Sequence, residues 1–360
     1  MEDITTPIGI GLIGYGGMGG YHVEQLMEHG VSCVQVIGIY DIKPERADLA
    51  RSRGVFAYDS REAMLCDPRV ELVVIVTPND THKEIMLDAI AHGKHVVCEK
   101  PVTMTLPDYE DMIAAADAAG LVFTVHQNRR WDPDFLIIKQ ILERNTLGPV
   151  FQIESRVHGS RGIPGDWRNR EAQGGGMLLD WGIHLLDQML QLMSDRRLLR
   201  IYAQLTNVTN EEVDDGFRAL CQFEGGYSFL AEVLTSNFIE LPRWYVLGEN
   251  GSAVIRDWDQ NGEIVMVSDW ENRDAVPVQA GVGLTKTMAP RNEDTIRRYP
   301  LPEPPALCCW KEYYGSVARA IRGLGAPAVS YDEQRRLLKL IAAVFESGRK
   351  NQVVAFDDVI

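Results

Sequence analysis

The sequence lacks the features that mark membrane-spanning, secreted or nucleic-acid-binding proteins. Its 360 residues contain no apolar run that approaches the roughly 18 residues needed to span a bilayer. The first residues, Met1-Glu2-Asp3-Ile4, have neither the basic start nor the apolar segment of a signal peptide, so we expect a cytoplasmic location. Basic residues number 36 against 51 acidic ones, and the net charge of -15 argues against nonspecific binding to nucleic acid.

Cysteine is also sparse, and its spacing fits neither a disulfide framework nor a zinc site. The six cysteines include no C-x-x-C pair. Four of them are scattered through apolar stretches, and two are adjacent: Cys33, Cys66, Cys98, Cys221 and Cys308-Cys309. We therefore expect reduced cysteines, most of them in the core, and no metal site.

A glycine-rich turn near the start is the first feature that points to a ligand. The apolar segment 8–14 leads into Gly14, Gly16 and Gly19, which have the spacing G-x-G-x-x-G. These glycines allow a tight turn, the approach of a pyrophosphate to the backbone, and close packing of helix on strand. N–H groups at the start of the helix then face the phosphates. We expect the whole turn to bind a dinucleotide, with Tyr15, Gly17 and Met18 included.

A carboxylate follows this turn at the spacing expected for ribose binding. The second apolar segment, 34–40, ends at Asp41, about 20 residues after Gly19. A carboxylate repels a 2′-phosphate, so Asp41 favours NAD, while the nearby Lys43 and Arg46 leave NADP as the alternative. The plainer interpretation is a packed βαβ unit in which the glycines are only steric.

Apolar segments alternate with helical ones through the first third of the chain. We predict six strands, at 8–14, 34–40, 55–58, 71–77, 95–99 and 121–125. This alternation is typical of a doubly wound parallel α/β sheet, in which ligands bind outside the carboxyl ends of the strands. Asp41, Thr77-Pro78-Asn79, Glu99-Lys100 and His126 stand at those ends.

The pattern changes in the second part of the chain, and 360 residues are too many for one ordinary core. We expect an N-terminal domain at 1–128 and a second, α+β domain at 129–360. The second domain has strand candidates at 150–158, 199–206, 217–223, 228–235, 244–247, 253–257 and 263–267. They predict a large, open, mostly antiparallel sheet, whose free face we expect to bind another subunit. Residues 269–305 suggest a long loop, and two amphipathic helices follow, at 310–322 and 332–349.

Three further residues could carry chemistry. A glycine run at 174–176 leads into a helix on which Asp180 and His184 are four residues apart, so they should share one face. A carboxylate beside an imidazole can make an oriented base, although such a pair is more often structural. The glycines favour function, because they weaken the helix and permit close approach of a ligand. Lys100, at a strand end beside Pro101, is the third candidate, and an ordinary turn lysine is the alternative.

These motifs, in this order, resemble the Gfo/Idh/MocA family of NAD(P)-dependent oxidoreductases over nearly the whole chain. The resemblance implies sugar, inositol or related polyol substrates, and dimers or tetramers built through the open sheet. It makes Lys100 the catalytic lysine and Asp180 with His184 the catalytic pair. It places cofactor contacts at Thr77, Pro78, Asn79, His82, Glu99, Lys100, Trp167 and Arg168. Substrate contacts are then expected at Asn128, Arg129, Trp131, Trp167, Asp180 and His184.

The implied reaction is hydride transfer between a secondary carbinol carbon and the nicotinamide. In this hypothesis His184, oriented by Asp180, takes the hydroxyl proton, and the Lys100 ammonium stabilises the developing alkoxide. The middle of the chain resembles members that oxidise a ring hydroxyl of glucosides, including C-glycoside 3-dehydrogenases. An inositol or free-sugar dehydrogenase, a redox glycosidase that regenerates NAD, and a non-catalytic NAD(P)-sensing regulator are the alternatives.

Overall fold

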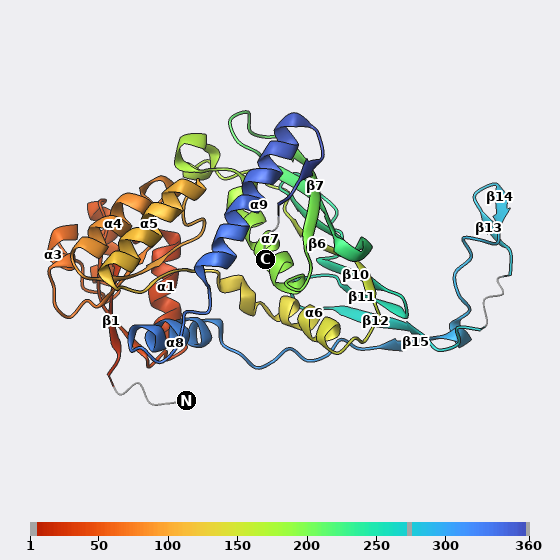
Figure 1. Ribbon diagram of the computed structural model, residues 1–360, viewed down its shortest axis with the longest axis horizontal. Helices are drawn as coiled ribbons and strands as arrows, with labels where there is room; N and C mark the ends of the chain where they lie inside the picture. The colour runs from red at the N-terminus through yellow and green to blue at the C-terminus, as the bar shows by residue number, and fades with distance from the viewer. Residues whose placement is uncertain (1–5, 272–275, 358–360) are drawn as a thin grey trace.

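The protein consists of two bodies that lie side by side, seen here in a computed structural model that describes residues 6–271 and 276–357 (Figure 1). The N-terminal body contains a five-stranded sheet, and the C-terminal body contains a nine-stranded sheet. No helix within the described residues is long and apolar enough to cross a membrane. The expected α/β class, with a parallel sheet followed by a larger open sheet, is confirmed.

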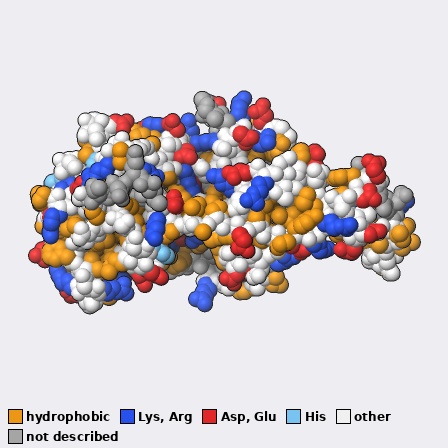
Figure 2. Space-filling view, turned by 90° about the horizontal axis from the view of Figure 1, so that it is seen from below, with side chains coloured by type: hydrophobic (Ala, Val, Ile, Leu, Met, Phe, Trp, Pro, Cys, Tyr) orange, Lys and Arg blue, Asp and Glu red, His pale blue; other side chains and the backbone are white. Residues whose placement is uncertain are grey.

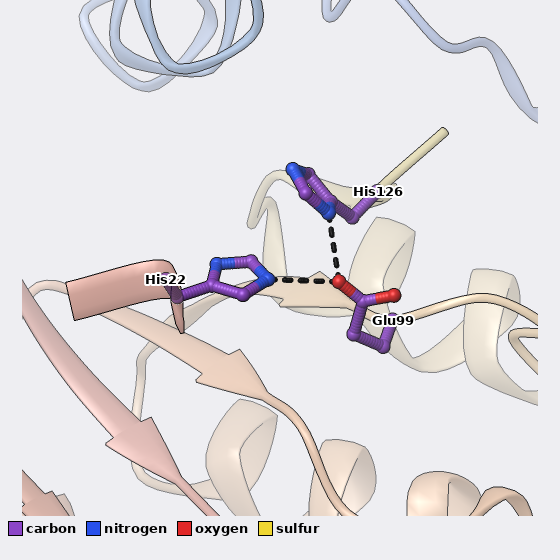
Figure 3. Close-up of side chains that lie close together, drawn as sticks. All are labelled: His22, Glu99 and His126. Atoms are coloured by element: carbon purple, nitrogen blue, oxygen red, sulfur yellow. Dashed lines mark hydrogen bonds and ion pairs between the residues drawn. The ribbon is translucent and has the colours of Figure 1, made fainter. Parts of the chain in front are cut away.

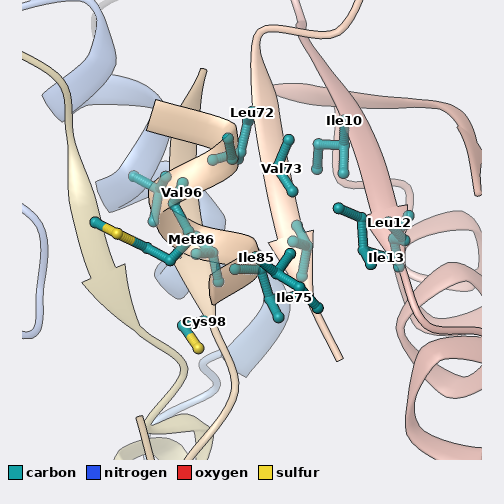
Figure 4. Packing of buried hydrophobic residues seen from close by; sticks show 14 of the residues in the cluster. Ile10, Leu12, Ile13, Leu72, Val73, Ile75, Ile85, Met86, Val96 and Cys98 are labelled. Carbon is teal, nitrogen blue, oxygen red and sulfur yellow. The ribbon is translucent and has the colours of Figure 1, made fainter. Parts of the chain in front are cut away.

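The first sheet is entirely parallel, with the order β2-β1-β3-β4-β5. Its strands are β1 (Ile8–Ile13), β2 (Val34–Tyr40), β3 (Leu72–Ile75), β4 (His95–Cys98) and β5 (Phe123–Val125). The helices of this body are α1 (Gly17–Glu28), α2 (Pro44–Ser52), α3 (Arg61–Leu65), α4 (His82–Ala91) and α5 (Leu106–Ala119). Every residue of β3 is buried, because both faces of the sheet are covered; Figure 4 shows Ile85 and Met86 of α4 packed against the strands.

The prediction of a strand at 55–58 is wrong. This segment makes only one isolated bridge, between Ile39 and Ala57. The backbone N–H of Ile39 donates to the oxygen of Phe56, and the N–H of Tyr58 donates to the oxygen of Ile39, each at 2.8 Å. The chain then turns into α3, where Ser60 caps the N–H of Ala63. The segment is too short to form a ladder, so the sheet has five strands.

The second sheet has the order β15-β12-β11-β10-β6-β9-β8-β7-β16, and β6 with β9 is its parallel pair. Its strands are β6 (Val150–His158), β7 (Leu198–Thr206), β8 (Gly216–Phe223), β9 (Ser228–Leu234), β10 (Trp244–Gly248), β11 (Gly251–Ile255), β12 (Gly262–Val267), β15 (Ile296–Tyr299) and β16 (Val354–Ala355). Helices α6 (Pro133–Glu143), α7 (Ile183–Leu192) and α9 (Tyr331–Lys350) pack on one face. In the part of the chain that the structure describes, no helix covers the opposite face (Figure 1).

Helix α8 (Cys309–Ile321) belongs to the core of the N-terminal body, although it lies far along the sequence. Trp310, Tyr313, Tyr314 and Val317 share one buried cluster with residues of β1 and β4. The chain therefore crosses back from the C-terminal body to complete the first core, and the polar groups of α8 come close to the ends of the parallel strands.

The predicted loop at 269–305 is partly wrong. Its last part forms β15, which pairs with β12. The described residues before it include a small hairpin, β13 (Val278–Ala280) with β14 (Gly283–Thr285), which stands away from the body as an arm (Figure 1). Residues 272–275 of the predicted loop lie outside the described residues.

The close packing of α1 on β1 gives a test of the glycine motif. A Cβ atom on Gly19 would lie 2.1 Å from the Gly14 oxygen, whereas one on Gly16 would meet nothing within 4 Å. We expect Gly19→Ala to lower stability by about 1–3 kcal/mol, despite the better helix propensity of alanine, because the backbone must move. Gly16→Ala should leave the unfolding curve unchanged. Urea unfolding of both variants measures the difference, and equal curves would contradict the packing.

Candidate functional site

The glycine turn and Asp41 form one continuous surface at the end of β1. Gly14 has a φ of 97°, and the N–H of Tyr15 donates to Oδ2 of Asp41 at 2.6 Å. Lys43 donates its backbone N–H to Oδ1 of the same carboxylate at 2.9 Å. Beside the turn is a hollow whose lining includes Tyr15, Gly16, Gly17 and Arg46. The open space above the glycines and the free helix start fit a dinucleotide pyrophosphate.

The two bodies meet at Lys100 and Asp180. The Lys100 ammonium donates to the backbone oxygen of Asp180 at 2.8 Å and lies 3.2 Å from its Oδ1. Both side chains are about five-sixths buried. Burial raises the pKa of Asp180, but the charges of Lys100 and Arg168 outweigh it and hold this pKa below its usual range. Asp180 is therefore a carboxylate that anchors the lysine.

The expectation that Asp180 orients His184 is wrong. Lys100 contacts one carboxylate oxygen of Asp180, and Nε of Arg168 donates to the other at 3.2 Å. Among the described residues, no hydrogen bond joins Asp180 to His184. Asp180 lies in η5 (Leu178–Gly182), a widened π-helical turn ahead of α7, and its two oxygens are already taken by the two cations.

His184 is nevertheless close to the same charges. It is 5% exposed, and its buried Nδ1 has no partner among the described residues. Burial lowers its pKa well below the ordinary value of 6.5, and the positive charges of Lys100 and Arg129 lower it further. The imidazole is therefore neutral near pH 7 and can accept a proton. His184 therefore lies within electrostatic range of the Lys100 ammonium, which comes from the other body.

An aromatic and cationic wall continues from His184. The ring of Trp181 lies 6.1 Å from the ring of His184, and the Arg129 guanidinium stacks 4.2 Å from the centre of the Trp181 ring. Trp258, from the turn between β11 and β12, lies 5.9 Å from Trp181. Asp132 bonds Arg129 at 2.9 Å, and burial raises the pKa of this carboxyl to about 6. Sequence reasoning missed Trp258 and Asp132, because neither belongs to a motif.

Other predicted contacts hold the loops around the site. The Asn79 amide, in η1 (Asn79–Thr81), donates to the Gly174 oxygen at 2.8 Å and joins the two bodies. His82 is buried, and its ring nitrogens lie 2.9 Å from the Thr77 oxygen and 3.0 Å from the Pro101 oxygen. This imidazole ties two strand-end turns together. Its predicted contact with a cofactor can therefore be only indirect.

The remaining predicted residues divide between the site and the core around it. The Arg168 guanidinium lies over the ring of Trp167, 4.6 Å from its centre, in η3 (Trp167–Asn169) beside Asp180. The ring of Trp131 packs edge-on against Tyr313 of the N-terminal core. Asn128 accepts a bond from Cys309 through its backbone oxygen. Thr77 and Pro78 occupy the turn after β3, at the edge of the sheet that carries the other candidates.

The glycine run before η5 is held by an acidic residue that the sequence did not single out. Asp214 accepts the N–H of Leu178 at 2.8 Å, and a Cβ on Gly176, whose φ is 104°, would lie 2.3 Å from its Oδ1. Only glycine fits this approach. Burial raises the pKa of Asp214 to about 6. The signal for this role was the acidic pair Asp214-Asp215 ahead of β8, which becomes informative only once the fold is known.

A buried cluster lies behind Lys100 and consists of His22, Glu99 and His126 (Figure 3). Oε1 of Glu99 lies 2.8 Å from Nε2 of His22 and 2.7 Å from Nδ1 of His126. These are hydrogen-bond distances, whereas donors on a tetrahedral zinc ion with bonds of about 2.0 Å would stand roughly 3.3 Å apart. The geometry fits a hydrogen-bonded carboxylate, and Glu99 has its oxygens turned to protein groups.

A glycine turn at the end of β1, a lysine after β4 of the same sheet and an unprotonated histidine in the second body are together typical of pyridine-nucleotide oxidoreductases. Comparisons with known proteins agree. The family model described as "Oxidoreductase family, NAD-binding Rossmann fold" matches residues 8–127, and the "GFO/IDH/MocA C-terminal domain" matches residues 135–254. The chain belongs to the Gfo/Idh/MocA family of NAD(P)-dependent oxidoreductases.

Individual relatives match over almost their full lengths. The crystal structure of an NAD-binding protein from Listeria innocua is 45% identical in sequence and has a TM-score of 0.93. The match covers 98% of this chain and 100% of the Listeria chain. The uncharacterized oxidoreductase YdgJ of Escherichia coli is 31% identical over 96% of this chain and 98% of its own. The scyllo-inositol 2-dehydrogenase (NADP(+)) IolW of Bacillus subtilis is 26% identical over 97% of this chain and 96% of its own.

The electrostatics of His184 can be tested directly. Arg129→Met should raise the pKa of His184 toward 6.5, because it removes a nearby positive charge and keeps an aliphatic chain against Trp181. NMR titration of the imidazole, assigned by comparison with His184→Gln, measures the shift. Arg46→Met, in the nucleotide hollow, is the control and should leave this pKa unchanged. An unaltered titration in Arg129→Met would refute the proximity of the two groups.

The lowered pKa of His184 also decides whether the protein becomes more or less stable as the pH falls. Below about pH 6.5 the unfolded chain binds a proton at His184 that the folded protein does not bind, until the pH reaches the folded pKa. This histidine therefore makes the protein less stable as pH falls through that window.

Proposed function

We propose that this protein transfers a hydride between NAD and the carbon of a secondary hydroxyl in a sugar, polyol or glycoside. The observation that carries the proposal is the convergence of Lys100, Asp180 and His184 from two domains, at the edge of the sheet where a dinucleotide binds. A non-catalytic regulator on the same fold would have no need of a neutral histidine beside a paired lysine.

The protein supplies position and charge, while a bound nicotinamide supplies the hydride chemistry. In the oxidation direction, the hydroxyl proton goes to His184, whose lowered pKa keeps it unprotonated beforehand. The Lys100 ammonium holds the hydroxyl oxygen and stabilises the negative charge that develops on it. Asp180 keeps the ammonium in place through its carboxylate and backbone oxygen. In the reduction direction the same groups act in reverse.

The preference for NAD over NADP rests on Asp41. Its carboxylate lies at the end of β2, where the adenosine ribose of a dinucleotide is expected, and it would repel a 2′-phosphate. Arg46 lines the hollow beside the glycine turn and is the group that would favour NADP. The relative IolW is named as NADP(+)-dependent, so the ratio of affinities for the two cofactors is the measurement that decides.

The substrate wall supports a cyclic substrate with an apolar ring face. Trp181 lies next to His184 and Trp258 lies next to Trp181, and the C–H face of a pyranose or cyclohexane ring can stack on such indole rings. We propose a glucoside, oxidised at a ring hydroxyl such as C3, as the first substrate to test, with inositols and free sugars as the alternatives. Absorbance in the NADH band during addition of each compound separates these classes. Release of an aglycone without net NADH would instead indicate a redox glycosidase.

The role of Lys100 gives the central test. Lys100→Ala should lower kcat by roughly 100-fold or more, because it removes the charge that stabilises the alkoxide, while the Kd for NADH stays within a few-fold. Lys83→Ala is the matched control, because Lys83 pairs with Asp108 and Asp111 on the surface. Steady-state kinetics and NADH fluorescence titration give the two readouts. Full turnover in Lys100→Ala would refute the assignment.

We further propose that the open face of the large sheet binds a second copy of this chain. Leu220 of β8 and Leu230 of β9 are paired across the strands, and Leu220 is 49% exposed. Hydrophobic side chains also gather on the C-terminal body beside the arm and at the arm itself (Figure 2). In the arm, Val282 and Leu284 are fully or largely exposed, and an isolated two-stranded hairpin is marginally stable. Packing against another subunit would bury both surfaces.

The subunit interface has its own test. Leu220→Arg should shift the protein toward monomer, because a charge enters an apolar contact. Met27→Arg is the control, since Met27 is 69% exposed on α1, away from the sheet. Sedimentation at micromolar concentration measures both variants. A wild-type protein that sediments as a monomer would remove the proposal, whatever the variants do.

A further inference from the structure

Three elements bring buried polar groups together behind the Lys100 turn. His22 comes from α1, Glu99 follows β4, and His126 follows β5 (Figure 3). Both imidazoles are completely buried, and Glu99 is 5% exposed. Both rings point at the same carboxylate oxygen, Oε1, as the dashed lines in Figure 3 show. A buried carboxylate is costly unless it is hydrogen-bonded, so the three groups depend on one another.

One arrangement of protons gives Oε1 of Glu99 two donors, although Nε2 of His126 has no partner among the described residues. His22 donates from Nε2 to Glu99, and its Nδ1, 3.0 Å from the Tyr314 hydroxyl, accepts the hydrogen of that tyrosine. His126 donates from Nδ1 to the same oxygen. Glu99 then carries one negative charge. Burial raises the pKa of Glu99, but the charges and hydrogen bonds of His126 and His22 outweigh it and hold this pKa well below its usual range.

The other oxygen of Glu99 is turned toward the backbone that carries Lys100. Oε2 accepts the backbone N–H of Lys100 at 3.1 Å. The next residue, Pro101, is held through its oxygen by His82 at 3.0 Å. The turn between β4 and the following loop is therefore tied down on both sides of Lys100. From this turn the ammonium crosses to Asp180 in the other body.

We propose that His22 and His126 are positioning residues for Lys100: they fix the Glu99 carboxylate, and Glu99 fixes the backbone turn from which the lysine acts. This inference rests on the proposed catalytic role of Lys100. Because small displacements of a catalytic group reduce rate more than binding, loss of either imidazole donor acts on kcat. Tyr314 extends the array to α8, so the C-terminal part of the chain helps to set the position of a lysine in the N-terminal sheet.

The two histidines offer matched pairs of variants. The side-chain amide of asparagine can place N–H where Nδ1 of His126 stands, and the amide of glutamine can place N–H where Nε2 of His22 stands. We expect His126→Leu and His22→Leu to lower kcat by roughly 10- to 100-fold, with the Kd for NADH within about 3-fold of the wild type. His126→Asn and His22→Gln should recover most of the loss. Tyr314→Phe, which removes one hydroxyl, should give a smaller decrease and remains informative if a leucine variant fails to fold.

A buried polar group away from the site provides a control that distinguishes loss of positioning from loss of stability. Lys94 is 8% exposed, and its ammonium donates to the backbone oxygens of Asp67 and Val70 near the amino ends of the strands, away from the site. Lys94→Met should lower Tm and leave kcat unchanged. If kcat follows Tm in every variant, or if the asparagine and leucine variants at position 126 are equally slow, the positioning role is overturned. If Lys100→Ala is itself fully active, the proposed function fails first, which is a separate result.

Discussion

The contact between Lys100 and Asp180 is the interaction on which the arrangement of the site depends. Lys100 follows a strand of the parallel sheet, and Asp180 lies in the widened turn before α7 of the other body, yet the ammonium is 2.8 Å from the Asp180 backbone oxygen. Both side chains are largely removed from water, so their attraction is less screened than that of a surface pair. Burial lowers the pKa of His184, and the same positive charge lowers it further. One lysine thereby joins the two bodies and helps burial to keep the histidine unprotonated.

The surrounding polar groups hold both sides of this contact in place. The backbone turn at Lys100 is held through Glu99 on one side and through His82 on the other, and the facing glycine run is held by Asn79 and Asp214. Each of these side chains is buried and hydrogen-bonded, which is the condition for a polar group to be tolerated in an interior. The two indole rings of the proposed substrate wall belong to Trp181, the residue after Asp180, and to Trp258, and they lie outside this set of hydrogen bonds.

Much of the fold could be predicted because its signals are local. The run 71–77 is rich in β-branched residues and marks a strand buried on both faces, and alternation along 150–158 gives the bounds of β6 as the structure has them. The errors arose where tertiary contacts decide. The segment 55–58 has strand-forming residues but makes one bridge, and 296–299 looks irregular but pairs with β12. The pairing expected between Asp180 and His184 failed because Lys100 and Arg168 occupy the two carboxylate oxygens of Asp180.

The sequence by itself determined the dinucleotide turn, the alternating N-terminal sheet, the open second sheet and the identity of Lys100, Asp180 and His184 as candidates. These features could be predicted because they depend on backbone freedom at glycine, on side-chain periodicity and on motif order. Each of these is visible in the sequence without knowledge of the tertiary structure. Only the tertiary structure decided which groups touch. Asp180 binds Lys100 instead of His184, and Glu99 is held by two histidines from different elements. Contacts across 80 residues depend on how packed elements meet in space, and no local pattern encodes that meeting.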